Sequence, residues 1–198
     1  MVKLLLPFYL FTFLLFSCSE NTGEEEEFAN WQAQNEAFFA SLEDSLRQAP
    51  DKWVKLKNFS LDQTTEGKVS DYVYAKKIET SQETESPMYT DSIRVSYQGR
   101  LLPSLSYADG YVFDGTVYGK YDIRTNDTAK FKLSGLIAGW VTPLLHMHRG
   151  DYWRIYIPSD MGYGDSGNGS SIPGYSVLVF DMTLIDFSPV GEVMRIYR

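Results

Sequence analysis

The sequence has little of the chemistry on which many enzymes depend. Its single cysteine, Cys18, excludes a disulfide within the chain, a cysteine-based zinc cluster and a catalytic cysteine in a folded core. Eighteen basic residues stand against 26 acidic ones, which gives a formal net charge of −8. Because nucleic acids are densely negative, this balance argues against a nucleic-acid partner. Any chemistry must therefore come from other side chains.

The composition is otherwise that of a folded globular protein with an excess of aromatic residues. Of the 198 residues, 43% are hydrophobic, 22% are charged and 15% are aromatic, which separates the chain from disordered and fibrous proteins. The sequence contains no internal repeat and no glycine-rich loop of the kind that binds phosphate. We expect one main domain with additional segments attached to it.

The amino-terminal segment predicts export and lipid attachment. One cation, Lys3, precedes an apolar run over residues 4–16, which is shorter than the roughly 20 residues that a bilayer-spanning helix needs. The run fits a secretory signal peptide, and its end, LFSC at residues 15–18, resembles the lipobox of bacterial lipoproteins. We predict a lipoprotein signal peptide over 1–17 and lipidation of Cys18, which would form a stable anchor. A buried amino-terminal helix with an incidental thiol is the alternative.

The next residues predict a solvated tether. Residues 18–27 contain four consecutive glutamates and cannot bury enough apolar surface to fold. The acidic run also resembles surface-export signals of some bacterial lipoproteins. Ser19, rather than an aspartate, follows the cysteine, which favours the outer membrane. We therefore expect a lipid-anchored protein of the bacterial cell envelope, on either its periplasmic or its outer face.

Residues 28–90 are expected to form a helix, a linker and a leading strand. Apolar residues recur at helical spacing over 28–48, and Pro50 follows. These apolar residues are Phe28, Trp31, Phe38, Leu42 and Leu46. Such a stripe packs either on the flank of its own domain or against a partner or second copy. Residues 60–70 are polar, which predicts a linker, and 72–79 predict a strand.

From residue 91 the pattern favours an α+β domain over 91–188, followed by a tail over 189–198. Alternation with a period of two predicts strands at 92–102, 130–133, 152–158 and 175–186, each bounded by turn-forming residues. One short helix is expected over 139–147. Several antiparallel strands and one helix predict a sheet with that helix packed on one face.

Two motifs suggest other chemistry, but their surroundings argue against it. Gly164-Asp165-Ser166-Gly167 copies the nucleophile segment of chymotrypsin-like proteases, whose serine needs a histidine base and a buried aspartate. The segment lies in a stretch rich in glycine and serine, which favours a flexible loop. His146 and His148 have a spacing found in some metal sites, with Asp151 as a possible third ligand. The end of a helix explains them better, so we predict no metal.

Six short motifs follow one another along the second half of the chain. They are VSYQGRL at 95–101, FDGT at 113–116, FKL at 131–133, LIAGW at 136–140, IPSDMGYG at 157–164, and IP at 172–173 with LVFDMTL at 178–184. In order and spacing the series resembles the FKBP-type peptidyl-prolyl isomerases over about residues 91–187. The resemblance implies the family's twisted antiparallel sheet wrapped around one short helix, in agreement with the alternating pattern.

The resemblance also implies a site, although spacing alone is compatible with a plain aromatic core. Trp140 would form the floor of a proline pocket, and Asp114 and the Tyr163 hydroxyl its polar rim. The walls would be Tyr97, Phe113, Phe131, Leu136, Ile137, Ile172 and Phe180, with the Ile137 amide as a donor to the substrate. Asp114, Tyr163, Trp140 and Phe180 are the candidate catalytic residues, and the others are candidate substrate-binding residues.

The implied reaction is cis–trans isomerisation of X-Pro bonds in exported proteins, which assists their folding in the cell envelope. Rotation about an amide must overcome about 18–20 kcal/mol of resonance and needs no nucleophile, metal or cofactor. The expected partners are proline-containing polypeptides. A non-catalytic FKBP-like module that binds peptides as a chaperone or assembly subunit is the alternative.

The sequence departs from the family pattern at a few positions near this site. The connection over 101–111 is lengthened, Ala129 replaces a second pocket aromatic, and Asn168 replaces a histidine common in the late loop. Gly174 and Tyr175 stand where a proline-containing turn is expected. We expect these differences to change access to the site or the choice of substrate.

Overall fold

The computed structural model describes residues 27–117, 119–122 and 124–194. The predicted signal peptide over 1–17, the lipidation site Cys18 and all of the predicted tether except Glu27 lie outside the described residues. In the part of the chain that is described, no helix combines the length and apolar character needed to cross a membrane.

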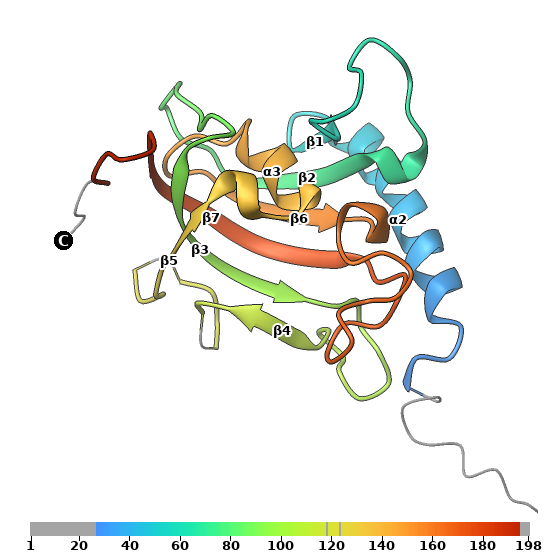
Figure 1. Ribbon diagram of the computed structural model, residues 1–198. Coiled ribbons are helices and arrows are strands. Elements are labelled where there is room, and N and C mark those ends of the chain that lie inside the picture. The colour runs from blue at the N-terminus through green and yellow to red at the C-terminus, as the bar shows by residue number, and fades with distance from the viewer. Residues whose placement is uncertain (1–26, 118, 123, 195–198) are drawn as a thin grey trace, which may run out of the picture.

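Within the described residues, seven strands form one antiparallel sheet in the order β1-β2-β6-β7-β3-β4, with β5 also paired to β3 (Figure 1). Their bounds are β1 Trp53–Lys57, β2 Tyr72–Glu79, β3 Ser92–Arg100, β4 Val112–Gly115, β5 Ala129–Lys132, β6 Tyr152–Ile157 and β7 Leu178–Ser188. β3 therefore pairs with β7 on one side and with both β4 and β5 on the other. The predicted antiparallel sheet is confirmed.

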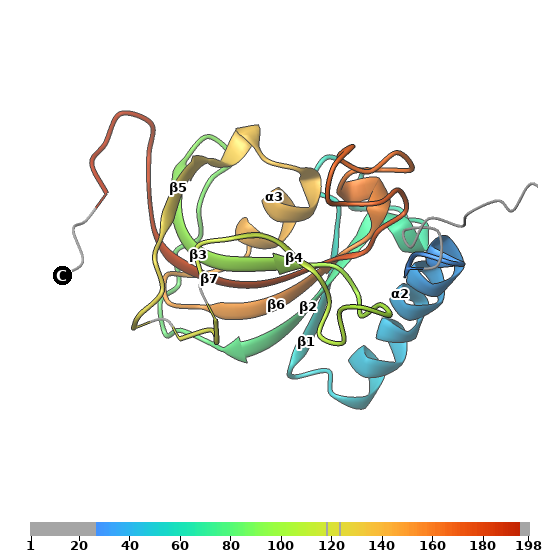
Figure 2. The same cartoon turned by 90° about the horizontal axis from the view of Figure 1, so that it is seen from below.

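The short helix α3, Ala138–Leu144, lies in the hollow of the curved sheet (Figure 2). Val141 and Leu144 on this helix are fully buried. Gly139 permits close approach, because a Cβ atom there would lie 2.1 Å from Cγ2 of Ile157 and 2.9 Å from the Met161 carbonyl oxygen. The predicted packing of one short helix against the sheet is confirmed.

The amino-terminal helix α2, Trp31–Gln48, runs beside the β1–β2 end of the sheet (Figures 1 and 2). Its Phe39 ring meets the Tyr74 ring edge-on at 5.3 Å. At the beginning of the helix, the Trp31 indole N–H donates to the Ser176 hydroxyl at 2.8 Å. The apolar face of α2 thus packs within the domain, with Trp31 and Leu42 buried and Phe38 and Leu46 half-buried, and α2 and β2 share one core with the strands that follow.

A polar clamp adds to this packing. The Tyr74 hydroxyl donates to the Glu43 carboxylate at 2.6 Å, and the Lys55 ammonium donates to the same oxygen at 2.9 Å. The pKa of Tyr74 is raised to about 12; burial is the largest cause, and the hydrogen bond to Glu43 is the second. Tyr74 therefore remains a neutral donor at physiological pH and joins β2 to α2.

Local details differ from the sequence expectations. The strand β1 was missed, because five residues with a weak alternation become a strand only through pairing with β2. The helix α2 begins at Trp31 rather than residue 28, since Asn30 has a φ of 56°. β7 begins at Leu178 rather than residue 175, because Tyr175 has a φ of 61° and belongs to a turn.

Candidate functional site

Trp140, in the first turn of α3, is the centre of an aromatic cluster inside the curved sheet. Its ring meets Tyr97 of β3 at 4.8 Å, Phe180 of β7 at 5.1 Å and Phe131 of β5 at 5.7 Å, each nearly edge-on. Phe113 of β4 meets Phe180 at 5.6 Å. Edge-to-face geometry suits the charge distribution of aromatic rings. Tertiary structure thus brings together five predicted site residues from five separate elements.

Exposure increases from the centre of this cluster outward. The inner residues Trp140, Tyr97, Phe180 and Ile172 are buried. Phe113, Phe131, Leu136 and Ile137 are half-buried, whereas Asp114 and Tyr163 are exposed. Tyr97, Phe180 and Ile172, predicted as walls, are therefore buried as deeply as the predicted floor, Trp140. Aromatic surface remains accessible at the edge of the core, through Phe113 and Phe131.

Tyr97 and Asp114 are joined by a hydrogen bond at the edge of the cluster. The Tyr97 hydroxyl donates to Oδ2 of Asp114 at 2.9 Å, and the Gly115 amide donates to Oδ1 at 2.8 Å. Burial raises the pKa of Tyr97 well above its usual range, and the hydrogen bond to Asp114 and the charges of Asp114 and Tyr163 raise it further. Tyr97 therefore stays neutral and orients the Asp114 carboxylate. Tyr163 lies near enough to Tyr97 for the two hydroxyl groups to interact electrostatically.

The backbone at the start of α3 supplies a further polar group. The Ile137 carbonyl accepts hydrogen bonds from Trp140 at 2.9 Å and from Val141 at 3.1 Å. In the described residues its own N–H donates no hydrogen bond. A backbone amide that lacks a partner at a helix start is available to a ligand carbonyl. This amide lies one turn before the Trp140 ring.

Gly99 of β3 makes the packing of the cluster possible. A Cβ atom at this position would lie 2.5 Å from Cε1 of Phe180 and 2.9 Å from the ring of Phe113. Any larger residue would force these rings apart. Gly99 lies in the VSYQGRL motif, but this packing role was not predicted; the signal in the sequence is a glycine within an otherwise regular strand pattern.

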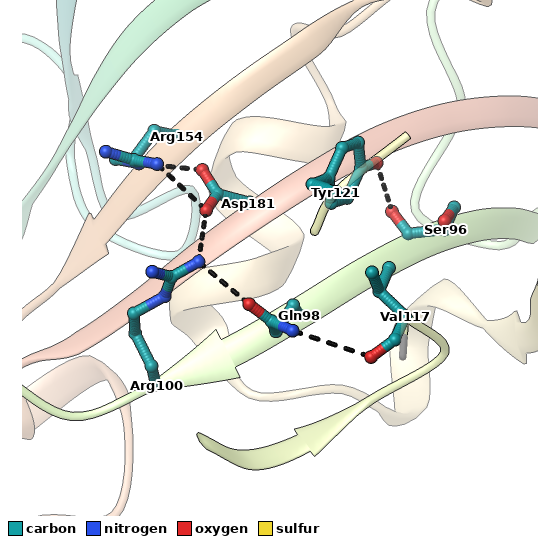
Figure 3. Close-up of polar contacts among 7 residues, drawn as sticks. All are labelled: Ser96, Gln98, Arg100, Val117, Tyr121, Arg154 and Asp181. Atoms are coloured by element: carbon teal, nitrogen blue, oxygen red, sulfur yellow. Dashed lines mark hydrogen bonds and ion pairs between the residues drawn. The ribbon is translucent and has the colours of Figure 1, made fainter. Parts of the chain in front are cut away.

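On the opposite face of the same strands, a buried carboxylate organises an ionic network (Figure 3). Asp181 of β7 is 1% exposed and accepts hydrogen bonds from Arg154 of β6 at 2.7 and 3.0 Å and from Arg100 of β3 at 2.7 Å. Arg100 also donates to Gln98 at 2.8 Å. The hydrogen bonds to Asp181 raise the pKa of Arg154. Since Asp181 follows Phe180 directly, the network fixes the strand that carries a central site residue.

Asn168 is another residue whose role the sequence analysis missed. Its side-chain oxygen accepts hydrogen bonds from the amides of Ser170, Ser171 and Ile172 at 3.1, 2.9 and 2.8 Å. An asparagine within a loop rich in serine and glycine is a recognisable turn signal. This side chain holds the segment that carries Ile172 into the core.

The motifs set aside on sequence grounds have ordinary structural roles. The Ser166 hydroxyl donates to its neighbour Asp165 at 3.0 Å. Asp151 accepts hydrogen bonds from the amides of Ser81 and His148 at 2.7 and 2.8 Å, so its carboxylate anchors a turn. Across the described ranges, no group of three or more histidine, cysteine, aspartate or glutamate residues is arranged to hold a metal ion.

Comparisons with known proteins identify the family of the chain. Residues 83–185 match the family model described as FKBP-type peptidyl-prolyl cis-trans isomerase. The chain is 38% identical over 100 residues to the FKBP-type 22 kDa peptidyl-prolyl cis-trans isomerase of Escherichia coli, an alignment that covers 50% of this chain and 43% of that protein. It is 30% identical over 161 residues to the isomerase FkpA of Escherichia coli, covering 81% of this chain and 52% of that protein.

A solved structure of a peptidyl-prolyl cis-trans isomerase from Pseudomonas syringae pv. tomato aligns with a TM-score of 0.48 and 31% sequence identity, covering 59% of this chain and 75% of that one. The chain spans about half the length of the two curated relatives from Escherichia coli, 43% of one and 52% of the other.

Proposed function

Because the chain belongs to the family of FKBP-type peptidyl-prolyl cis-trans isomerases, we propose that it isomerises X-Pro bonds in exported polypeptides and so assists their folding. The observation that carries this proposal is the aromatic cluster around Trp140, whose exposure rises from a buried floor to a polar rim. A proline ring is compact and apolar, so it matches a surface built from aromatic faces and edges.

The proposed mechanism lowers the barrier to rotation about the amide bond. That barrier of about 18–20 kcal/mol comes from resonance that places negative charge on the carbonyl oxygen. Apolar surroundings disfavour the charge-separated planar form more than the twisted form, so transfer into the aromatic site favours rotation. An acceleration of 10⁴-fold requires about 5.4 kcal/mol of preference for the twisted state.

Polar groups at the rim would hold the substrate during rotation. The Ile137 N–H is positioned to donate to a substrate carbonyl, since in the described residues it has no hydrogen-bond partner of its own. The Asp114 carboxylate, oriented by Tyr97, would accept a hydrogen bond from a backbone N–H of the substrate. The Tyr163 hydroxyl, 42% exposed, would donate to a second backbone carbonyl. Amide rotation breaks no covalent bond, so these groups suffice without a nucleophile, metal or cofactor.

The decisive experiment measures cis–trans exchange of a short X-Pro peptide by NMR, using the full chain with and without changes to the rim. We expect Asp114→Ala and Tyr163→Phe each to lower kcat by about tenfold while the peptide Kd changes less than threefold, because both groups act mainly on the rotating state. Tyr89→Phe is the matched control, since Tyr89 is similarly exposed, at 44%, and its ring packs against Phe59, outside the aromatic cluster.

The same experiment separates the isomerase from the alternative, a non-catalytic peptide-binding module. If the wild-type chain binds the peptide but does not accelerate exchange, the binding module is the correct function. If both rim variants keep full turnover, the roles assigned to Asp114 and Tyr163 are wrong even though the isomerase assignment stands.

We further propose that the protein is anchored in the bacterial cell envelope, in the outer membrane, through lipid on Cys18. The lipobox-like LFSC sequence and the acidic run after it support this location. Cys18→Ser should move the protein from the detergent phase to the aqueous phase in detergent partitioning and abolish labelling by a fatty-acid analogue, since two acyl chains give stable attachment. Ser19→Ala is the control and should remain in the detergent phase. Equal partitioning of the wild type and Cys18→Ser would refute the anchor.

A further inference from the structure

A second hollow lies beside the aromatic cluster, at the end of the molecule where three segments meet. It has a volume of about 710 Å³ and is lined by residues from the segment before α2, the loop after β3 and the loop before β7. Its lining includes Phe28, Tyr107, Tyr111, Ile172 and Pro173. Figures 1 and 2 show these three segments at the same end of the sheet.

Ile172 connects this hollow to the proposed proline site. It is 3% exposed, packs in the same apolar core as Trp140 and Phe180, and also lines the hollow. Ile172 is also one of the predicted walls of the proline site, so one side chain borders the hollow and belongs to that predicted site. A polypeptide bound at the proline site would reach the hollow by passing Ile172.

The walls of the hollow are held in place before any ligand binds. The loop after β3 is closed by hydrogen bonds from Leu101 to the Tyr111 carbonyl and from Gly110 to the Tyr107 carbonyl, both at 2.9 Å. Gly110 has a φ of 83°, and a Cβ atom there would lie 2.0 Å from the Leu101 oxygen. The conformation therefore requires glycine, and a bound peptide would not have to order this loop.

The other two walls are fixed as well. Glu27 accepts hydrogen bonds from the Ser106 amide at 3.1 Å and the Ser106 hydroxyl at 2.6 Å, which ties the segment before α2 to the loop after β3. The Asn168 side chain holds the loop that carries Ile172 and Pro173. Phe28 packs edge-on against Trp31 at 5.1 Å.

The chemistry of the lining selects an apolar side chain on an extended backbone. Tyr107 and Tyr111 meet edge-on at 5.0 Å, and Tyr107 is 44% exposed. Phe28, Ile172 and Pro173 add apolar surface, and the polar groups of the lining are serine hydroxyls from both loops and the Glu27 carboxylate, which is already bonded to Ser106. Rigid aromatic rings interspersed with small hydroxyl residues give large contact area and adaptable hydrogen bonding to a peptide backbone.

We propose that this hollow is a second subsite for the polypeptide substrate, which binds an aromatic or large aliphatic residue a few positions from the proline. The inference rests on the proposed function, since it assigns the substrate class of the same site. It implies that the enzyme selects substrates by a flanking apolar residue in addition to the X-Pro bond.

The test compares a blocked four-residue X-Pro peptide with longer peptides in which one phenylalanine is moved from one to five positions on either side of the proline. With the full chain, we expect one placement to raise kcat/KM, and Tyr107→Ala to remove that gain by a fivefold to tenfold rise in KM, about the value of one aromatic contact. The four-residue peptide should be isomerised at the wild-type rate by this variant.

Leu105→Ala is the matched control, because Leu105 lies on the same loop, is 79% exposed and does not line the hollow. Phe28→Ala tests the opposite wall and should lower the gain in the same way. The subsite is refuted if no placement of phenylalanine matters, or if Tyr107→Ala slows short and long peptides equally.

Measuring peptide binding directly tests the subsite independently of the proposed isomerase activity. If the wild-type chain isomerises no peptide, calorimetric Kd values for the long peptides still decide the matter. A fivefold to tenfold weaker Kd in Tyr107→Ala, with Leu105→Ala unchanged, supports the subsite, whereas equal Kd values for all three proteins overturn it.

Discussion

Trp140→Ala is expected to remove proline-peptide binding and to lower kcat/KM by about a hundredfold or more. The indole touches three other rings of the cluster, at 4.8, 5.1 and 5.7 Å, and has 5% of its surface exposed. Its loss would leave a cavity where the proline ring is proposed to lie. NMR exchange with a short X-Pro peptide measures the loss of turnover, and calorimetry measures the loss of binding.

Two further variants show whether the effect is local. Trp140→Phe keeps an aromatic floor and should retain measurable turnover, which separates loss of the site from loss of folding. Trp53→Ala removes a large ring that stacks on Tyr156 at 5.6 Å, outside the cluster, and should leave kcat/KM near the wild-type value. Full turnover by a folded Trp140→Ala protein would show that the substrate proline does not bind at Trp140.

Asp181→Ala is expected to destabilise the fold by about 3–5 kcal/mol. The Asp181 carboxylate is 1% exposed and neutralises two guanidinium groups, those of Arg100 and Arg154, on the face of the sheet opposite the aromatic cluster. Removing it leaves two close positive charges without their shared partner, on side chains that are 22% exposed in Arg100 and 39% exposed in Arg154. Urea denaturation followed by circular dichroism measures the change in the free energy of unfolding.

A half-buried aspartate that pairs with an exposed arginine provides the control for this prediction. Asp122 forms an ion pair with Arg124 at 2.6 Å, but that guanidinium is 84% exposed. Because water screens such pairs, Asp122→Ala should change the unfolding free energy far less. A comparable small change in Asp181→Ala would mean that Arg100 and Arg154 reach solvent easily, and that the network does not stabilise the strand carrying Phe180.

These two predictions concern the two faces of the same strands. Along β3, Tyr97 and Gly99 face the aromatic cluster while Gln98 and Arg100 face the ionic network, as the alternation of a strand requires. The register pairs Gly99 with Phe180 and Gln98 with Asp181. The ionic network thus holds the strands of the site in position from the opposite face of the sheet.

The class of fold could be predicted from the amino-acid sequence, and so could the residues that meet in the aromatic cluster. Alternation with a period of two located β2, β3, β5, β6 and β7, since one face of each strand must be buried, whereas the four residues of β4 are too few to show such a pattern. The ordered motifs located Trp140, Phe180 and the other members of the cluster, because they follow the order and spacing of the family's motifs and so match individual positions in this chain. The helical spacing over 28–48 likewise predicted α2 to within three residues at its start.

Features that depend on contacts between distant segments became visible in the tertiary structure alone. β1 exists through its pairing with β2, so its own residues gave too weak a signal. The roles of Gly99 and Asp181 follow from side chains that approach from other strands, and the second hollow forms where residues near 28, 107 and 172 meet. A local sequence pattern shows which residues of one segment are buried. Which side chains from distant segments touch depends on how the segments pack together, and no short stretch of sequence carries that information.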